Sequence, residues 1–154
     1  MNHQSLSEDR PAVDLSLLLV RVIVGVIFAA HGAQKLFGVW GGRGLEATVA
    51  PPPDGMGPIG YLVTIGEFFG GLGLVVGFLT RFSAASLIVI MIGAIAMVHG
   101  KNGFFMSAGG YEYNLALIGL LLPTLIAGPG KHTVGRCLPL PKAANSDRPI
   151  VILE

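Results

Sequence analysis

Residues 15–38 read LSLLLVRVIVGVIFAAHGAQKLFG, and this stretch decides the fold class. It is 24 residues long. An α-helix of that length measures about 36 Å, which is enough to cross the hydrocarbon core of a bilayer with some tilt. Its ionisable residues are Arg21, His31 and Lys35. Charged groups inside a membrane are costly unless they are paired or hydrated, so each of these residues requires an explanation.

The composition of the whole chain also indicates a membrane protein. Hydrophobic residues make up 52% of the 154 residues and charged residues 12%, and the mean hydropathy is +0.69. So few charged residues cannot cover a water-soluble globule of this size, and we expect a lipid bilayer as the partner of the apolar surface. The net charge of +1 gives no basic field for nucleic acid, so no nucleic-acid partner is expected.

Three further apolar segments follow the first. We therefore expect an all-α fold, a transmembrane four-helix bundle, with an arrangement as two tandem helical hairpins left open. The predicted division is a polar N-terminal tail at 1–14, a membrane domain at 15–128 with helices at about 15–38, 59–80, 82–99 and 111–128, and a polar C-terminal tail at 129–154. The connection 39–58 contains a run of three prolines and is expected to be extended.

The distribution of Lys and Arg predicts the orientation of the bundle. With four spans, both termini share one side of the membrane, and that side holds seven basic residues: Arg10, Arg21, Arg81, Lys131, Arg136, Lys142 and Arg148. The other side holds three: Lys35, Arg43 and Lys101. The positive-inside rule then places both termini in the cytoplasm. The N-terminus has no basic segment before the first apolar stretch, so we expect that stretch to be retained as a helix.

This topology brings five ionisable residues to the outward half of the bundle: His31, Lys35, Glu67, His99 and Glu112. Lys35 and Glu67 are expected to form one ion pair, and His99 and Glu112 a second. A short acidic side chain such as Glu67, well inside a span, cannot reach the interface and needs a partner. The five residues are the predicted ligand-binding set, whereas Arg21 and Arg81 are predicted to form structural charge pairs.

The chemistry of this set favours an anionic or quinone-like ligand. His and Glu side chains near a wet membrane face can hydrogen-bond the carbonyls of a quinone and move protons. No metal is expected, because the Glu-x-x-His spacing of di-iron bundles is absent and Lys35 opposes a cation. The single cysteine, Cys137, excludes an internal disulfide. The chain also lacks a haem-attachment motif, a nucleotide loop and CxxC, so a partner protein must bring any redox centre.

The sequence resembles the DoxX family. The resemblance rests on the run from Arg21 to Gly38, on EFFGGLGL at 67–74, on GFLTR at 77–81, and on His99-Gly100, Glu112 and Gly128-Pro129-Gly130. It implies a four-helix bacterial inner-membrane protein of a family named after a subunit of a thiosulfate:quinone oxidoreductase. The matching charged positions are Arg21, His31, Lys35, Glu67, Arg81, His99 and Glu112. The family name does not by itself make this chain catalytic, and no catalytic residue is assigned.

The leading hypothesis is therefore an inner-membrane subunit associated with redox chemistry, which binds quinone or a similar small ligand at the outward polar cluster. At most it is the membrane subunit of a quinone-linked oxidoreductase, with a redox partner protein or a second copy of itself as companion. The alternative is a non-catalytic membrane scaffold, or a small transporter subunit, whose buried charges only pair helices. The substrate, the partner and the oligomeric state are left open.

Overall fold

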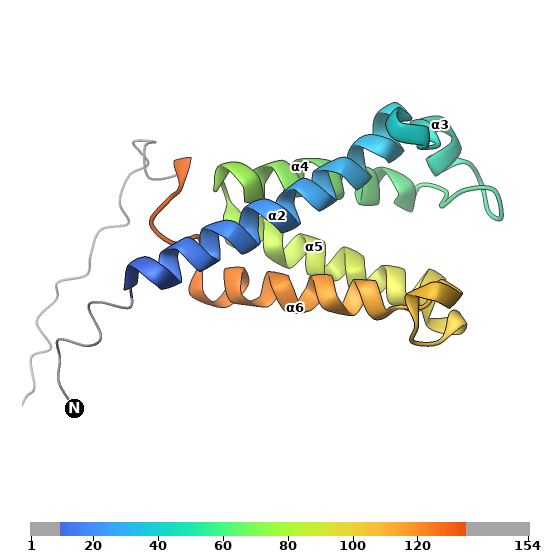
Figure 1. Ribbon diagram of the computed structural model, residues 1–154. Coiled ribbons are helices and arrows are strands. Elements are labelled where there is room, and N and C mark those ends of the chain that lie inside the picture. The colour runs from blue at the N-terminus through green and yellow to red at the C-terminus, as the bar shows by residue number, and fades with distance from the viewer. Residues whose placement is uncertain (1–9, 135–154) are drawn as a thin grey trace, which may run out of the picture.

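The structure is a computed structural model that describes residues 10–134 of the chain. Four long helices dominate it: α2 (Arg10–Phe37), α4 (Ile59–Val76), α5 (Thr80–Ala94) and α6 (Glu112–Ala127). They pack side by side as a bundle (Figure 1), and no strand occurs between residues 10 and 134. The predicted all-α class is confirmed.

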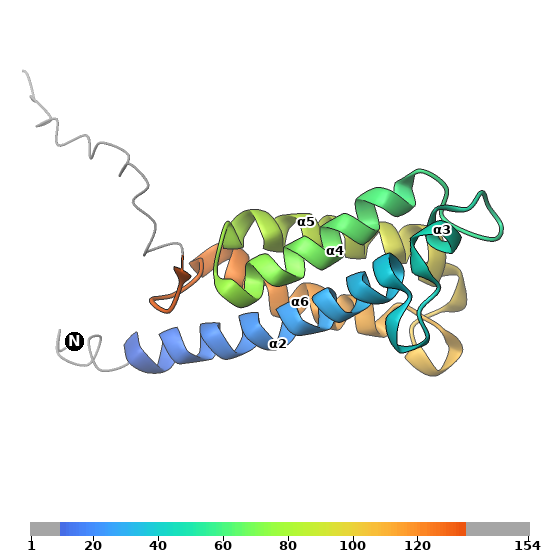
Figure 2. The same cartoon turned by 90° about the horizontal axis from the view of Figure 1, so that it is seen from above.

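The helices pack as two consecutive hairpins. Helix α2 packs mainly on α4, α5 packs mainly on α6, and the two hairpins meet through α4 with α5 and, less extensively, α2 with α6. The start of α2, the end of α6 and the α4–α5 turn lie at one end of the bundle, which we call the tail end (Figures 1 and 2). The α2–α4 and α5–α6 connections lie at the opposite end, the loop end.

The outer surface of the bundle is apolar. Three stretches are long and apolar enough to cross a membrane: Pro11–Phe37, Ile59–Val76 and Thr80–Asn102. Helix α6 is apolar but shorter. Large aliphatic side chains such as Leu62, Val89 and Ile126 are mostly exposed. In water such a surface would be a liability, whereas in lipid it is the expected outside of the molecule.

The core is made by the side chains that face the centre of the bundle. Its buried members are Val24, Phe28, Leu74, Ala84, Leu87, Met91, Leu117 and Leu121. They come from all four helices, so the two hairpins share a single apolar centre.

Glycines let α2 and α4 approach closely. A Cβ added at Gly25 would lie 2.7 Å from the carbonyl oxygen of Gly71, and one added at Gly32 would lie 2.6 Å from Cα of Phe68. Both obstacles are backbone atoms, which cannot turn aside as a flexible side chain can. Small residues at such a crossing are typical of membrane helix pairs, where van der Waals packing drives association.

The helix boundaries differ from the predicted ones at several points. Helix α2 begins at Arg10 and not at residue 15, since Pro11 is well accommodated in a first helical turn, where its missing N–H needs no partner. Helix α4 ends at Val76 and not at residue 80, because Gly77 takes up a left-handed conformation (φ 74°) and its N–H bonds the carbonyl of Gly73. Helix α5 then begins at Thr80, two residues before the predicted start.

The loop end is more structured than predicted. The connection 39–58, expected to be extended, contains a short helix α3 (Gly44–Val49) and the 3-10 turn η1 (Val39–Gly41), and α3 packs on both α2 and α4. Helix α5 continues as a π-helical turn η2 (Ile95–His99), followed by the 3-10 turns η3 (Gly100–Asn102) and η4 (Met106–Ala108). Helix α6 runs on through Pro123 to Ala127.

Candidate functional site

A buried ion pair joins the first hairpin near its loop end. The Lys35 ammonium on α2 donates to the Glu67 carboxylate on α4, which confirms the predicted pair. The Glu67 side chain is 5% exposed, whereas that of Lys35 is 25% exposed. A carboxylate this deep in an apolar helix needs a cation beside it, because an unpaired charge there would cost several kcal/mol.

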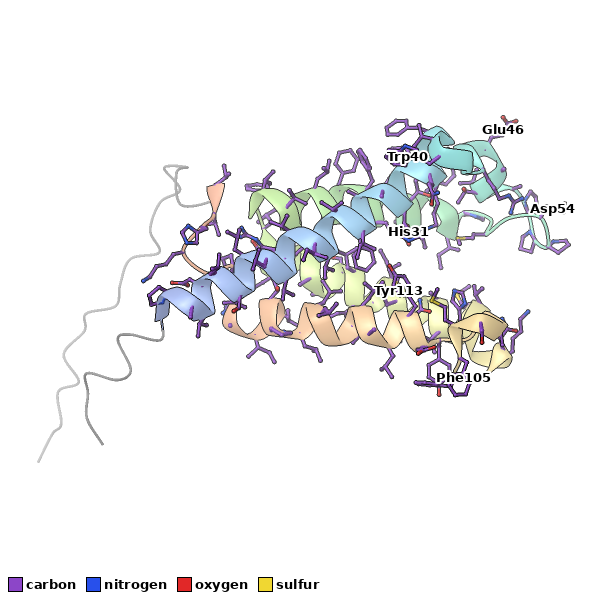
Figure 3. All side chains as sticks on the ribbon, viewed as in Figure 1. His31, Trp40, Glu46, Asp54, Phe105 and Tyr113 are labelled. Atoms are coloured by element: carbon purple, nitrogen blue, oxygen red, sulfur yellow. The ribbon has the colours of Figure 1, made fainter. Side chains whose placement is uncertain are left out.

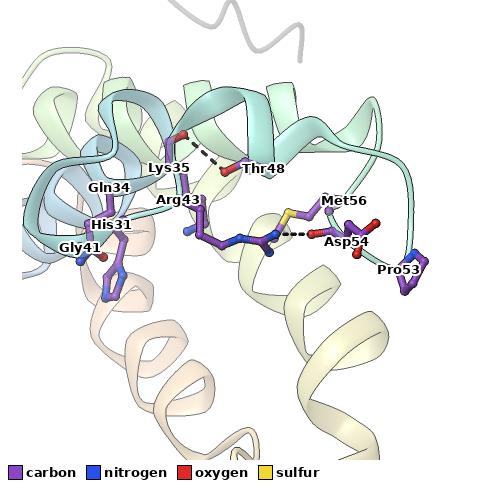
Figure 4. Close-up of a pocket in the computed structure, with 11 residues that line it drawn as sticks. His31, Gln34, Lys35, Gly41, Arg43, Thr48, Pro53, Asp54 and Met56 are labelled. Carbon is purple, nitrogen blue, oxygen red and sulfur yellow. Dashed lines mark hydrogen bonds between the residues drawn. The ribbon is translucent and has the colours of Figure 1, made fainter.

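A pocket of about 410 Å³ opens beside this pair, between the end of α2 and the α2–α4 connection (Figure 4). Its volume lies within the range of small-molecule sites. The lining residues are His31, Gln34, Lys35, Gly41, Gly42, Arg43, Thr48, Pro53, Asp54, Gly55 and Met56. Lys35 thus borders the pocket, while Glu67 holds it from outside the lining.

Backbone hydrogen bonds shape the wall of the pocket. The Thr48 hydroxyl lies 3.4 Å from the carbonyl oxygen of Lys35 and 2.7 Å from that of Gly44, so it ties α3 to α2. The amide of Met56 donates to the Thr48 carbonyl at 2.8 Å. Arg43 donates through Nη2 to the carbonyl oxygen of Asp54 at 2.5 Å. These bonds fold the proline-rich stretch back over the end of α2.

The pocket is rich in hydrogen-bond donors. His31, Gln34 and Lys35 occupy one face of α2, because residues three and four apart are neighbours on a helix. Arg43 adds a guanidinium from the connection. Together these side chains can bind a ligand through oxygen atoms that carry full or partial negative charge.

Sequence reasoning missed most of this lining, because His31 and Lys35 are the only predicted ligand-binding residues in it. Gln34 shares a helix face with His31, and that spacing could have pointed to it. Arg43, Thr48 and Asp54 sit in a connection that was expected to be extended. Their bonds end on carbonyl oxygens, which every residue possesses, so no sequence pattern marked them.

The second hairpin uses its histidine and acid differently. Nδ1 of His99 donates to the carbonyl oxygen of Gly109 at 2.8 Å, and the Glu112 carboxylate accepts the amide of Met106 at 2.9 Å. Between residues 10 and 134 the ion pairs are Lys35–Glu67 and Asp14–Lys131. The expected His99–Glu112 pair is therefore wrong, because loop backbone groups lie nearer to both side chains.

The expected convergence of five ionisable residues is also only partly met. His31 and Lys35 line the pocket and Glu67 contacts Lys35. His99 and Glu112 bond the backbone of the α5–α6 connection and do not line this pocket. Figure 1 shows the two connections on separate hairpins at the loop end. Residues predicted to lie on the same side of the membrane therefore do not all form one site.

Arg21 and Arg81 were predicted to form charge pairs, but among residues 10–134 neither of them takes part in an ion pair. Arg21 is 2% exposed and donates to the carbonyl oxygens of Pro129 at 3.2 Å and His132 at 2.5 Å. Arg81 donates to the carbonyl oxygen of Ile126 at 3.1 Å. Ile126 lies in the last turn of α6, whose carbonyls lack intrahelical partners and carry the negative end of the helix dipole, so they attract a cation. The partners of Arg21 lie beyond the end of α6, in the segment that follows it.

No group of three or more His, Cys, Asp or Glu side chains within the described residues could hold a metal ion. Cys137 lies outside residues 10–134.

Fold and site together define a class, namely an all-α membrane protein whose helices carry a donor-rich pocket at one end of the bundle. The DoxX family profile matches residues 16–100, which is more than half of the chain. The chain belongs to the DoxX family.

Relatives extend the match beyond that region. The chain is 27% identical over 125 residues to the "Inner membrane protein YqjF" of Escherichia coli, which covers 81% of this chain and 93% of the relative. It is 30% identical over 109 residues to the "Putative oxidoreductase CatD" of Bacillus subtilis, covering 71% and 78% respectively. No solved structure matches the chain.

Proposed function

We propose that the protein is a redox-associated subunit of the bacterial inner membrane that binds a quinone, or a small ligand of similar chemistry, in this pocket. One observation carries the proposal: four side chains that carry hydrogen-bond donors, His31, Gln34, Lys35 and Arg43, line one cavity. A quinone has two carbonyl oxygens that accept hydrogen bonds and gain negative charge on reduction. Donors that are already in place stabilise that charge.

Each residue has a proposed role in this site. His31 is exposed, and no hydrogen bond to its ring is found among residues 10–134, so it is free to bind a ligand oxygen and exchange a proton. Lys35 binds the ligand from the α2 side of the pocket, and Glu67 orients Lys35 through their ion pair. His99 and Glu112 are given no ligand contact.

The proposed topology has four membrane crossings with both termini in the cytoplasm. The tail end collects Arg21, Arg81 and Lys131, together with the start of α2 and the end of α6 (Figure 1). By the sequence, the side of the membrane that holds both termini has seven basic residues and the other side three, and this excess supports a cytoplasmic placement. The pocket then faces outward, where a ligand can enter from water or from the outer leaflet.

The redox centre comes from a partner in this proposal. The chain has a single cysteine and no motif for haem or a nucleotide. The Bacillus subtilis relative carries the name "Putative oxidoreductase CatD", which supports an association with electron transfer. The flavin, haem or metal that exchanges electrons with the ligand would be held by another subunit.

The single tryptophan, Trp40, allows a direct test, because it precedes the pocket residue Gly41 in the chain. We expect a water-soluble short-chain quinone to quench Trp40 fluorescence saturably in lipid nanodiscs. His31→Ala should weaken this binding by about tenfold, the loss of one hydrogen bond to a charged or polarised oxygen. His99→Ala is the matched control and should leave the affinity unchanged.

Quenching that never saturates, or that responds equally to the two histidine variants, would refute the ligand site. Organic extraction of the purified protein adds an independent readout, since a bound quinone should be recovered from the wild type and lost from His31→Ala.

The competing function is a membrane scaffold, and one observation favours it. Glu67 lies outside the pocket lining, and its only partner within residues 10–134 is Lys35, so the pair serves helix packing whether or not a ligand binds. If no quinone binds and Lys35→Met/Glu67→Met folds with full stability, the scaffold is the better account.

A further inference from the structure

The α5–α6 connection presents an apolar surface at the loop end. Phe104, Phe105 and Met106 follow one another in the chain and are 44%, 66% and 62% exposed. They protrude from a connection between two helices, where polar residues are usual. We name these three residues the apolar tip.

The connection holds the apolar tip in place. Backbone amides of Gly110 and Glu112 donate to the carbonyl oxygens of Phe105 at 3.0 Å and Phe104 at 2.9 Å. The Phe104 ring packs edge-on against those of Phe105 and Tyr111, with centroids 5.4 and 5.6 Å apart. These hydrogen bonds and ring contacts fix the loop in a conformation in which the three side chains are exposed.

The residues that were expected to bind a ligand stabilise this loop. His99 and Asn102 both donate to the carbonyl oxygen of Gly109, at 2.8 and 3.1 Å, and Glu112 accepts the amide of Met106. Three polar side chains therefore fix a segment whose exposed surface is apolar. Such an arrangement makes sense if the apolar surface has an occupant.

The length of α6 indicates what that occupant is. Its 16 residues measure about 24 Å, whereas the hydrocarbon core of a bilayer is about 30 Å thick. The other three stretches are long enough to cross. A bundle with one short helix matches the bilayer only if apolar groups beyond that helix extend the hydrophobic band.

The first hairpin presents aromatic side chains at the same end. Trp40 is 74% exposed and held at φ 49°, and Phe37 is 62% exposed. Figure 3 shows Trp40 and Phe105 at the loop end on separate hairpins. Aromatic side chains at the ends of membrane spans are typical of the interface between lipid and water.

We propose that the apolar tip is an interfacial anchor that inserts into the outer leaflet and supplies the hydrophobic length that α6 lacks. Its partner is the lipid surface. The proposal rests on the four-pass topology proposed above, but not on ligand binding. Glu112 and His99 are positioning residues: they are not part of the apolar tip, but their hydrogen bonds hold the loop that carries it.

Fluorescence quenching by brominated phosphatidylcholine tests the anchor. In a Trp40→Phe background, Phe105→Trp places a reporter on the apolar tip, and Glu46→Trp places one on the exposed surface of α3 as a control. We expect lipids brominated near the glycerol end of the acyl chain to quench the reporter at 105, with little quenching at 46. An aqueous quencher should act in the reverse order.

Two results would overturn the anchor. One is a reporter at 105 that only the aqueous quencher reaches. The other is a reporter at 105 that neither quencher reaches but that becomes exposed on dilution, since this would show that a second copy covers the tip. Labelling of Lys101→Cys in a Cys137→Ser background, from outside intact cells, tests the topology separately. If that cysteine is labelled only after permeabilisation, the proposed orientation of the bundle is refuted. The quenching experiment still shows whether the apolar tip inserts into lipid.

The positioning role has its own readout. Glu112→Ala removes the acceptor of the Met106 amide, so acyl-chain quenching of the reporter at 105 should fall. Glu46→Ala, at an exposed glutamate of α3, should leave it unchanged. Equal quenching in the two variants would refute the role of Glu112.

Discussion

The two hairpins carry similar polar residues and use them in opposite ways. In the first, Glu67 is buried in the middle of α4, pairs with Lys35, and leaves His31 open to a pocket. In the second, Glu112 is the first residue of α6, and both it and His99 bond the backbone of their own connection. The comparison teaches that depth along the helix decides whether an acid needs a cation or can serve a loop.

Removal of the Lys35 ammonium should give the largest difference between the hairpins. Lys35→Met leaves Glu67 as a buried charge without a partner, and we expect a loss of about 3 kcal/mol in the free energy of unfolding. Unfolding by sodium dodecyl sulfate in mixed micelles measures it. The double variant Lys35→Met/Glu67→Met should recover most of the loss, and if it does not, the pair is not the cause.

The two arginines at the tail end give the next largest contrast. Arg21→Met keeps most of the volume but removes a buried guanidinium that donates to two carbonyls, so we expect a loss of about 2–3 kcal/mol. Arg81→Met removes a single exposed bond and should cost less than about 1 kcal/mol. The same unfolding titration compares them, and equal losses would contradict the difference in burial.

A glycine in each hairpin shows how closely the helices pack at that point. At Gly32 an added methyl group meets the backbone of Phe68, whereas nothing lies within 4 Å of one added at Gly119. We expect Gly32→Ala to destabilise the bundle by about 1–3 kcal/mol through overpacking. Gly119→Ala should be neutral, or stabilising by up to about 1 kcal/mol through helix propensity. Thermal unfolding of both variants in one detergent would expose any reversal of this order.

The two histidines give the smallest effect on stability. His99→Ala loses the bond to Gly109 and should cost about 1 kcal/mol. His31→Ala loses no bond among the described residues and should stay within about 0.5 kcal/mol of the wild type. In the quinone titration His31→Ala should lower the affinity and His99→Ala should not, whereas in the unfolding experiment the order is reversed. A variant that lowers both the quinone affinity and the free energy of unfolding would contradict the different roles of the two histidines.

The helices were predictable because an apolar run of sufficient length is a property of the chain alone. The Lys35–Glu67 pair was predictable because an acid well inside a span needs a cation, although counting from the loop end puts Lys35 third in α2 and Glu67 ninth in α4. Helix ends were less predictable, because Gly77 and Leu79 take up left-handed conformations that shorten the α4–α5 turn.

The rest of the site depends on partners without a sequence signature. Arg21, Arg81 and Arg43 all donate to carbonyl oxygens, and any residue can supply one. The expected His99–Glu112 pair failed because the connection between them folds on itself and offers nearer backbone partners. Proline at 51–53 suggested an extended segment, although the bonds of Thr48 and Arg43 curl the same segment over α2.

The contact of Arg21 also has a consequence for biogenesis. Arg21 belongs to the first helix, and its carbonyl partners lie 108 and 111 residues further along the chain. A ribosome delivers the first helix to the membrane long before it has made those residues. Until they emerge, the guanidinium must stay with water, lipid phosphate or the insertion machinery. The last residues of the described chain thus complete the contacts of the first helix. A nascent chain halted at Ala127 would contain helices α2 to α6 and still lack the acceptors of Arg21.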